Sequence, residues 1–186
     1  VALVGYTNAG KSTLFNRLTQ GKAIAVDKLF ATLDAKTQRA AFSTPAETVI
    51  IDTVGFIRKL PHQLVEAFGA TLDETRLADL ILHVVDASAS EEELLEMTKA
   101  VEDVLLGIGA DEAPRVLVLG KADLIDEERR GELAHRHPDA VLVSAVTGEG
   151  LEALIERIEL EFTNTLREVE LLIPYPEGGR LAELHE

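Results

Sequence analysis

The sequence predicts an α/β fold in which helices pack against a mostly parallel β-sheet. Short apolar runs, typical of buried strands, alternate with segments whose apolar residues recur every three or four positions, as on one face of a helix. This alternation indicates βαβ units, which produce a parallel sheet. A glycine-rich motif also stands between the first apolar run and the first helical segment. Because ligands of such sheets bind beyond the carboxyl ends of the strands, we expect a binding site at that edge.

The individual elements follow from these periodicities and from the residues that bound them. Strands are expected at residues 1–5, 40–42, 48–51, 80–85, 116–119 and 141–143, and helices at residues 11–18, 64–72, 91–106, 126–136 and 151–162. Ser90, with Glu93 three residues later, predicts a capping box for the helix at 91–106. Residues 23–37 show no clean period and are expected to form a loop. After residue 163 the pattern changes, with a strand expected at 169–173 and a helix from Arg180 onward.

Composition is that of an ordinary globular domain, with 186 residues, 46% hydrophobic and 27% charged. The absence of cysteine excludes a disulfide framework. No apolar run approaches the roughly 20 residues that a membrane helix needs, and we expect a cytoplasmic protein. The formal charge of −15 argues against broad contact between this domain alone and nucleic-acid phosphates. Since the chain opens at Val1, inside a strand pattern, we expect it to be part of a longer protein.

Residues 5–12 match the phosphate-loop pattern GxxxxGK[ST], and they follow an expected strand and open an expected helix. In this context glycines let the backbone approach phosphate closely, and the helix N-terminus adds positive potential. Lys11 is expected to reach the β- and γ-phosphates, and Ser12 to bind Mg²⁺. The residues expected to bind nucleotide here are Asn8, Ala9, Gly10, Lys11, Ser12 and Thr13.

Two further segments predict the metal and γ-phosphate side of the site. Asp52 closes an apolar strand, where a second carboxylate for Mg²⁺ is needed. Gly55 has no side chain between its N–H and the γ-phosphate. Thr32, in the irregular segment 30–34, is expected to complete the metal shell when the γ-phosphate is present, which makes that loop a nucleotide-sensitive switch. We therefore predict catalytic roles for Lys11, Thr32 and Gly55, and metal ligation by Ser12, Thr32 and Asp52.

Base recognition is predicted at the ends of the last two strands. The Asp123 carboxylate can accept hydrogen bonds from the ring N–H and the amino group of guanine, whereas adenine presents an acceptor there. The Lys121 stem can cover the face of the base. Ser144 and Ala145 follow the final strand, where the Ala145 N–H can meet the guanine carbonyl oxygen. A P-loop ATPase or kinase is the first alternative, and Asp123 and Ala145 argue against it.

These motifs resemble the translation-factor-related GTPases and, within them, the HflX family. The matching segments are residues 5–16 for the phosphate loop, 30–34 for the first switch, 52–57 with apolar positions up to Leu72 for the second switch, and 173–175 for the entry to a C-terminal domain. The resemblance implies a GTPase domain at residues 1–163 with a six-stranded sheet, one strand antiparallel, followed by a linker and the start of a C-terminal domain at 164–186. It also implies action on the ribosome, mainly on the large subunit, through subunit splitting or rescue under stress. The family's N-terminal domain is absent from this sequence, and we expect a monomer.

Three positions bear on mechanism. Phe56 stands where many related GTPases carry a water-orienting Gln, so slow intrinsic hydrolysis is expected, and a nucleotide-gated binding module with incidental hydrolysis is the second alternative. Asn8 resembles a phosphate-loop Asn that binds K⁺ in some relatives, although hydrogen bonding within the loop explains it equally well. Gly120 replaces the usual Asn of the NKxD motif, which predicts nucleotide binding weakened by about 1–2 kcal/mol and tightened again by Gly120→Asn.

The histidines show no metal-ligand spacing and are interpreted as solvated: His62, His83, His135, His137 and His185.

Overall fold

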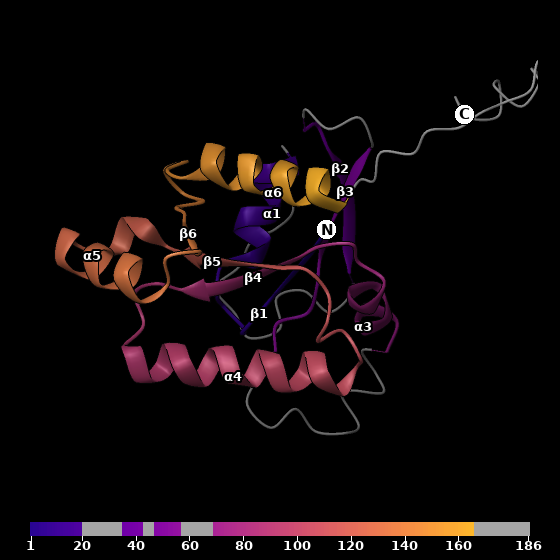
Figure 1. Ribbon diagram of the computed structural model, residues 1–186, viewed down its shortest axis with the longest axis horizontal. Coiled ribbons are helices and arrows are strands. Elements are labelled where there is room, and N and C mark those ends of the chain that lie inside the picture. The colour runs from indigo at the N-terminus through magenta and orange to yellow at the C-terminus, as the bar shows by residue number, and fades with distance from the viewer. Residues whose placement is uncertain (20–34, 43–46, 57–68, 166–186) are drawn as a thin grey trace, which may run out of the picture.

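Six strands form one sheet in the order β2-β3-β1-β4-β5-β6 (Figure 1). The computed structural model describes residues 1–19, 35–42, 47–56 and 69–165. The strands are β1 (Ala2–Gly5), β2 (Lys36–Ala40), β3 (Thr48–Asp52), β4 (Ile81–Asp86), β5 (Arg115–Gly120) and β6 (Val141–Leu142). Paired strands run parallel except β2 and β3, which are antiparallel. The expected α/β sheet with one antiparallel strand is therefore confirmed.

Helices cover both faces of this sheet, with α1 and α6 on one face and α4 on the other (Figure 1). Leu82 and Val84 of β4 pack in one core cluster with Phe15 of α1 and Ile158 of α6. Alternate β4 residues point the opposite way, toward α4 and α5. Burial on both faces explains why residues 80–85 are apolar apart from His83, with no alternation of polar and apolar residues. The helices are α1 (Lys11–Thr19), α3 (Gly69–Arg76), α4 (Glu91–Gly107), α5 (Glu127–Arg136) and α6 (Leu151–Thr165), with a short 3₁₀ turn, η1 (Ala122–Leu124).

Local signals set the starts of the two helices next to the site. The predicted capping box is present in α4, where the Glu93 N–H donates to Ser90 Oγ at 3.4 Å and the Ser90 N–H donates to Glu93 Oε2 at 3.0 Å. In α5 the Asp126 side chain is the N-cap and accepts the Arg129 N–H at 2.9 Å. Each cap satisfies a backbone donor that the first helical turn leaves unpaired. Helix α4 therefore begins at Glu91 as predicted, and α5 begins one residue later than predicted.

The second strand was misplaced. It spans Lys36–Ala40, before the predicted 40–42, and it takes in the last two residues of the predicted loop at 23–37. Its central residues are exposed, so no apolar pattern marks it. An edge strand of this kind is defined by its hydrogen bonds to β3, from Lys36 opposite Asp52 to Ala40 opposite Thr48.

Several predictions fall on residues outside those that the structure describes. They include Thr32, the first half of the predicted 64–72 helix, the predicted strand at 169–173 and the helix from Arg180. The proposed domain boundary at 163/164 falls in the last turn of α6, and the segment assigned to a C-terminal domain remains a prediction. Within the described ranges, no helix is both long and apolar enough to cross a bilayer.

The prediction that the histidines are solvated was wrong for His83. This residue lies in β4, between Val4 of β1 and Leu117 of β5, and its exposure is only 5%. In the described part of the chain its Nε2 has no hydrogen-bond partner. Burial, together with the charges of Arg115 and Lys11, lowers its pKa to about 4. His135 is exposed and His137 half-buried, while His62 and His185 lie outside the described residues.

We expect His83 to make the fold sensitive to mild acid. Its pKa is about 4 in the folded chain and 6.5 when unfolded, so the unfolded state binds the proton more readily. The stability that follows from neutral His83 is present above pH 6.5 and is lost as the pH falls toward 4. Over that window the loss approaches about 3 kcal/mol. Urea unfolding of the wild type and of His83→Leu between pH 7 and pH 4 should show a flatter pH dependence for the variant, with His135→Leu as the exposed control. Parallel curves for wild type and His83→Leu would contradict the assignment.

Candidate functional site

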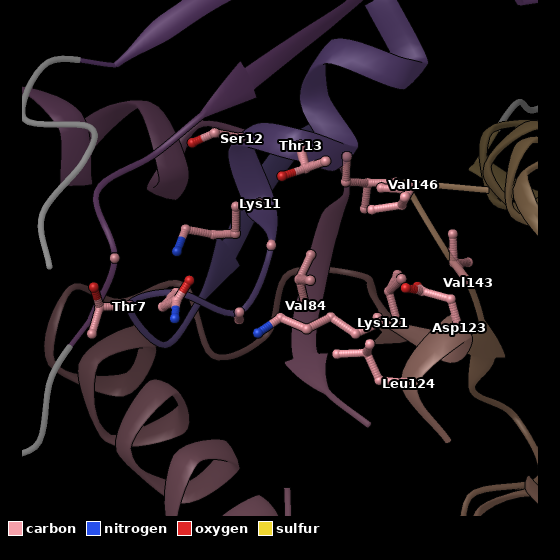
Figure 2. A pocket seen from close by; sticks show the side chains of 18 of the residues that line it. Thr7, Lys11, Ser12, Thr13, Val84, Lys121, Asp123, Leu124, Val143 and Val146 are labelled. Atoms are coloured by element: carbon pink, nitrogen blue, oxygen red, sulfur yellow. The ribbon is translucent and has the colours of Figure 1, made fainter. Parts of the chain in front are cut away.

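A cavity of about 470 Å³ opens at the carboxyl ends of the central strands, between the phosphate loop and the residues that follow β5 and β6 (Figure 2). Most predicted site residues line it, although they come from positions more than 130 apart in the sequence. Those that line the cavity are Asn8, Ala9, Gly10, Lys11, Ser12, Thr13, Gly55, Lys121, Asp123 and Ala145. Asp52 and Ser144 are fully buried behind this lining. Thr32 lies outside the described residues.

The phosphate loop is held in shape by its glycines and by Lys11. A Cβ on Gly5 would lie 2.2 Å from the Val84 carbonyl oxygen, so only glycine fits there, and Gly10 has a φ of +97°. Lys11 Nζ donates to the carbonyl oxygens of Gly5 and Tyr6, each at 3.1 Å. Burial lowers the pKa of Lys11 to about 8, although the charge of Asp52 opposes the shift. The lysine is thus held inside the loop, where a bound phosphate could exchange for these carbonyl contacts.

A hydroxyl and a carboxylate meet beside the loop. Ser12 Oγ donates to Asp52 Oδ2 at 2.6 Å, and Asp52 closes β3 with no exposed surface. Thr53 Oγ1 donates to the Leu3 carbonyl oxygen at 2.6 Å, which ties the end of β3 to β1. No cluster of three or more His, Cys, Asp or Glu side chains able to hold a metal occurs in the described ranges. A cation here would therefore be held by these two oxygen groups together with oxygens of a ligand, a donor set that suits Mg²⁺.

The segment after β3 runs directly against the phosphate loop. The Thr7 N–H donates to the Phe56 carbonyl oxygen at 2.8 Å, and the Phe56 N–H donates to that of Gly5 at 3.1 Å. A Cβ on Gly55 would lie 2.7 Å from Thr7 Cα and 3.2 Å from Lys11 Nζ. The Phe56 ring is fully buried in the core cluster next to α3 and α4. It faces away from the cavity, so this residue cannot orient water there.

At the other end of the cavity, two loops hold a carboxylate. Ser144 Oγ donates to Asp123 Oδ1 at 2.5 Å and accepts the Thr147 N–H at 3.1 Å. This hydroxyl fixes one Asp123 oxygen, and Asp123 itself is exposed toward the cavity (Figure 2). Ser144, predicted to lie at the base site, is fully buried and contacts the base-reading candidate Asp123, and a direct contact between Ser144 and a base stays a prediction.

Lys121 is positioned by a residue that the sequence reasoning missed. Its backbone is left-handed, at φ 60° and ψ 37°, and its Nζ donates to Asp86 Oδ2 at 2.7 Å. Burial opposes ionisation of Asp86, but hydrogen bonds from Lys121 and from the Ser88 side chain and N–H hold its pKa below the usual range. The ion pair pins the end of Lys121, so its stem lies along the cavity wall (Figure 2).

Two arginines that no sequence motif indicated donate hydrogen bonds to the loops after β5 and β6. Arg17 of α1 donates from Nε to the Ala145 carbonyl oxygen at 2.7 Å and from a terminal nitrogen to that of Val146 at 2.5 Å. Arg130 of α5 donates to the Ala122 carbonyl oxygen at 2.7 Å and pairs with Glu149. Arg17 contacts residues 128 and 129 positions away, and Arg130 joins the segment after β5 to the loop that carries Glu149.

We expect Arg17→Met to weaken binding of the nucleotide that the phosphate-loop motif predicts, measured with GDP, without changing the fold. Arg17 is exposed, but its guanidinium group donates two hydrogen bonds to the loop that carries the Ala145 N–H. Losing these two hydrogen bonds should cost about 1 kcal/mol of binding free energy, or roughly fivefold in Kd. Calorimetric titration of the wild type, Arg17→Met and Arg17→Lys measures the effect, and partial recovery is expected for lysine, which keeps a donor. Arg39→Met, on the exposed edge strand, serves as control. An unchanged Kd for Arg17→Met would contradict this role.

The phosphate loop between β1 and α1, the buried carboxylate at the end of β3 and the Lys121–Asp123 segment after β5 define the class of P-loop GTPase domains. The chain belongs to the family described as 50S ribosome-binding GTPase, whose model matches residues 1–121. The predicted resemblance to HflX is also confirmed. The chain is 46% identical over 183 residues to the GTPase HflX of Escherichia coli and 46% identical over 175 residues to that of Caldanaerobacter subterraneus. These matches cover 97% and 94% of the chain but only 42% and 39% of the relatives' own length.

Solved structures share the fold. A GTP-binding protein from Sulfolobus solfataricus in complex with GDP superposes with a TM-score of 0.71 at 30% identity, covering 89% of this chain and 52% of that one. Era in complex with MgGDPNP and a segment of 16S ribosomal RNA gives a TM-score of 0.64 at 28% identity, covering 93% and 58%.

Proposed function

We propose that this chain binds guanine nucleotides with Mg²⁺ and hydrolyses GTP to GDP and phosphate. The observation that carries the proposal is that the two ends of the cavity present different chemical groups. Lys11, Ser12 and Asp52 lie at the end suited to phosphate, and the Ser144-bound carboxylate of Asp123 lies at the end suited to guanine. The family and the two nucleotide-bound neighbours support the same assignment.

In the proposed reaction the chain positions GTP and stabilises charge. Backbone N–H groups of residues 8–13 surround the phosphates, and Lys11 exchanges its contacts with Gly5 and Tyr6 for β- and γ-phosphate oxygens. The Gly55 N–H donates to the γ-phosphate, where negative charge develops. Thr32 lies outside the described residues, and its role as a metal ligand of the first switch stays a prediction. Ser12 and Asp52 would hold Mg²⁺, which neutralises phosphate charge when bound.

Position 56 provides no side chain that can orient the attacking water, and we therefore expect slow intrinsic hydrolysis. The buried Phe56 ring offers no hydrogen-bonding group to the cavity. A partner or a monovalent cation can supply what is missing. We propose K⁺ beside Asn8, whose φ of 63° places it at the turn of the phosphate loop. A higher GTPase rate in K⁺ than in Na⁺ at equal ionic strength is expected, and equal rates would remove K⁺ from the proposal.

For the partner we propose the ribosome, chiefly its large subunit, with the whole protein acting as a monomeric, cytoplasmic switch in subunit splitting or rescue under stress. The family description and the ribosomal RNA bound to the related Era support a ribosomal target. The net charge of −15 argues against a broad RNA contact by this chain alone, so we propose that other parts of a longer protein make most of that contact.

Calorimetric titration with GDP and ADP, in Mg²⁺ and K⁺, tests the nucleotide assignment. Micromolar GDP binding without detectable ADP binding is expected, because Asp123 would face a lone pair of adenine. Equal binding of both would favour the ATPase alternative. GTP hydrolysis measured with and without 50S subunits then separates a partner-stimulated GTPase from a nucleotide-gated binding module, which would bind but show no stimulation.

A further inference from the structure

The base end of the cavity has an apolar floor beneath Gly120. Leu14, Val84, Val118 and Val143 all line the cavity, and all belong to the main hydrophobic core. Figure 2 shows Val84 between Lys11 on the phosphate side and the Lys121–Asp123 side. A ligand in this cavity can therefore contact core valines directly, and a Cβ at position 120 would lie against one of them, Val84.

The space beside Gly120 can be described by the distances from a Cβ built on this residue to the neighbouring atoms. A Cβ placed there would lie 3.4 Å from the Ala9 carbonyl oxygen, 3.5 Å from that of Val85 and 3.6 Å from Val84 Cγ1. These are ordinary contact distances, so a Cβ fits there without displacing its neighbours. We call the space bounded by Gly120, Val84 and the Ala9 carbonyl the Gly120 notch. Apart from the backbone of residues 119–121, the polar atoms nearest to this Cβ are the carbonyl oxygens of Ala9 and Val85, which accept hydrogen bonds and cannot donate them.

The orientation of a bound purine follows from the two ends of the cavity, and this step rests on the proposed function. Asp123 takes the N1 and N2 donors of guanine, and the Ala145 N–H takes O6. The next ring positions after O6 are N7 and C8. In this orientation N7 and C8 face the part of the cavity wall between the base-reading residues and the phosphate loop. The Gly120 notch lies in that part of the wall.

We propose that the Gly120 notch receives the N7–C8 edge of the base and offers it acceptor oxygens and a methyl group but no donor, so that the chain prefers purines without a hydrogen-bond acceptor at N7. In water N7 accepts a hydrogen bond. In the notch it faces the acceptor oxygen of Ala9 and the Val84 methyl group, while the Lys121 amine is held by Asp86. A 7-deazaguanine ring carries C–H in place of N7, so it loses no hydrogen bond on entering and meets the carbonyl oxygen without repulsion.

Titration with GDP and with 7-deaza-GDP tests the subsite on the same preparation. We expect 7-deaza-GDP to bind as tightly as GDP or tighter, by about threefold to tenfold, because burying an unpaired acceptor is unfavourable. If 7-deaza-GDP binds more than about threefold more weakly than GDP, some group donates to N7 and the proposal is overturned. A chain that binds neither nucleotide instead contradicts the guanine-nucleotide function, so the two failures are distinct.

Gly120→Asn should reverse the preference. Its amide can reach both N7 and the Ala9 carbonyl oxygen, so GDP should bind about fivefold or more tighter than 7-deaza-GDP in this variant. Gly131→Asn is the matched control, since a Cβ at Gly131 on α5 meets nothing within 4 Å. An unchanged ratio in Gly120→Asn, with the variant folded by circular dichroism, would contradict the placement of N7. If the variant does not fold, the wild-type ratio decides alone.

Discussion

Asp123→Asn should abolish guanine selection and create binding of xanthine nucleotides. Two donors of guanine, N1–H and the amino group, point at the Asp123 carboxylate in the proposed orientation. An amide nitrogen in place of one oxygen meets the amino group with a donor, whereas xanthine carries a carbonyl oxygen at that position. Hydrogen bonds to a charged group are worth about 1.5–3 kcal/mol each, so we expect a loss of about 100-fold or more in GDP affinity.

Calorimetry with GDP, XDP and ADP on the same variant measures the switch. Because the Asn oxygen can still accept from Ser144 Oγ, the contact that now measures 2.5 Å can persist and the loops should keep their shape. Gain of XDP binding would itself show that the variant is folded. Asp139→Asn, outside the cavity lining, is the control. Retained GDP affinity in Asp123→Asn would place guanine recognition elsewhere.

Gly55→Ala should stop hydrolysis while sparing nucleotide binding. The added Cβ would lie 2.7 Å from Thr7 Cα, a backbone atom of the phosphate loop, and 3.2 Å from Lys11 Nζ. Relief of the clash with the Thr7 backbone moves the 53–56 segment away from the phosphate loop, and this shift withdraws the Gly55 N–H from the γ-phosphate. Loss of one such donor typically lowers kcat by about 10²–10³. GDP, which lacks the γ-phosphate, should bind within a few-fold of wild type.

Single-turnover GTP hydrolysis and GDP titration on the same preparations separate these effects. Gly107→Ala is the matched control, because a Cβ at this end of α4 meets nothing within 4 Å. A Gly55→Ala rate within threefold of wild type would show that the Gly55 N–H has no part in the reaction. A comparable loss of GDP affinity would instead indicate collapse of the phosphate loop.

The features that the sequence predicted correctly depend on residues that lie close together along the chain. The phosphate loop, the Ser90–Glu93 capping box and the apolar run of β4 each depend on contacts or periodicities within a few positions. The edge strand β2 carried no such signal, because its residues are exposed and only pairing with β3 defines it. His83 was misjudged for a related reason. Its polar side chain suggests solvent, but its place in the central strand buries it between β1 and β5.

The sequence by itself determined the class of fold, the order of the elements and most of the cavity lining, because parallel strands must deliver their carboxyl ends to one edge of the sheet. Only the tertiary structure decided how those residues are held. The contact of Ser144 with Asp123, the Lys121–Asp86 pair and the Arg17 fork join residues between 21 and 129 positions apart. The same is true of the Gly120 notch, which brings the end of β5 next to Val84 of β4 and the Ala9 carbonyl of the phosphate loop. Such contacts depend on the distance between strands and helices in space, which spacing along a chain does not encode.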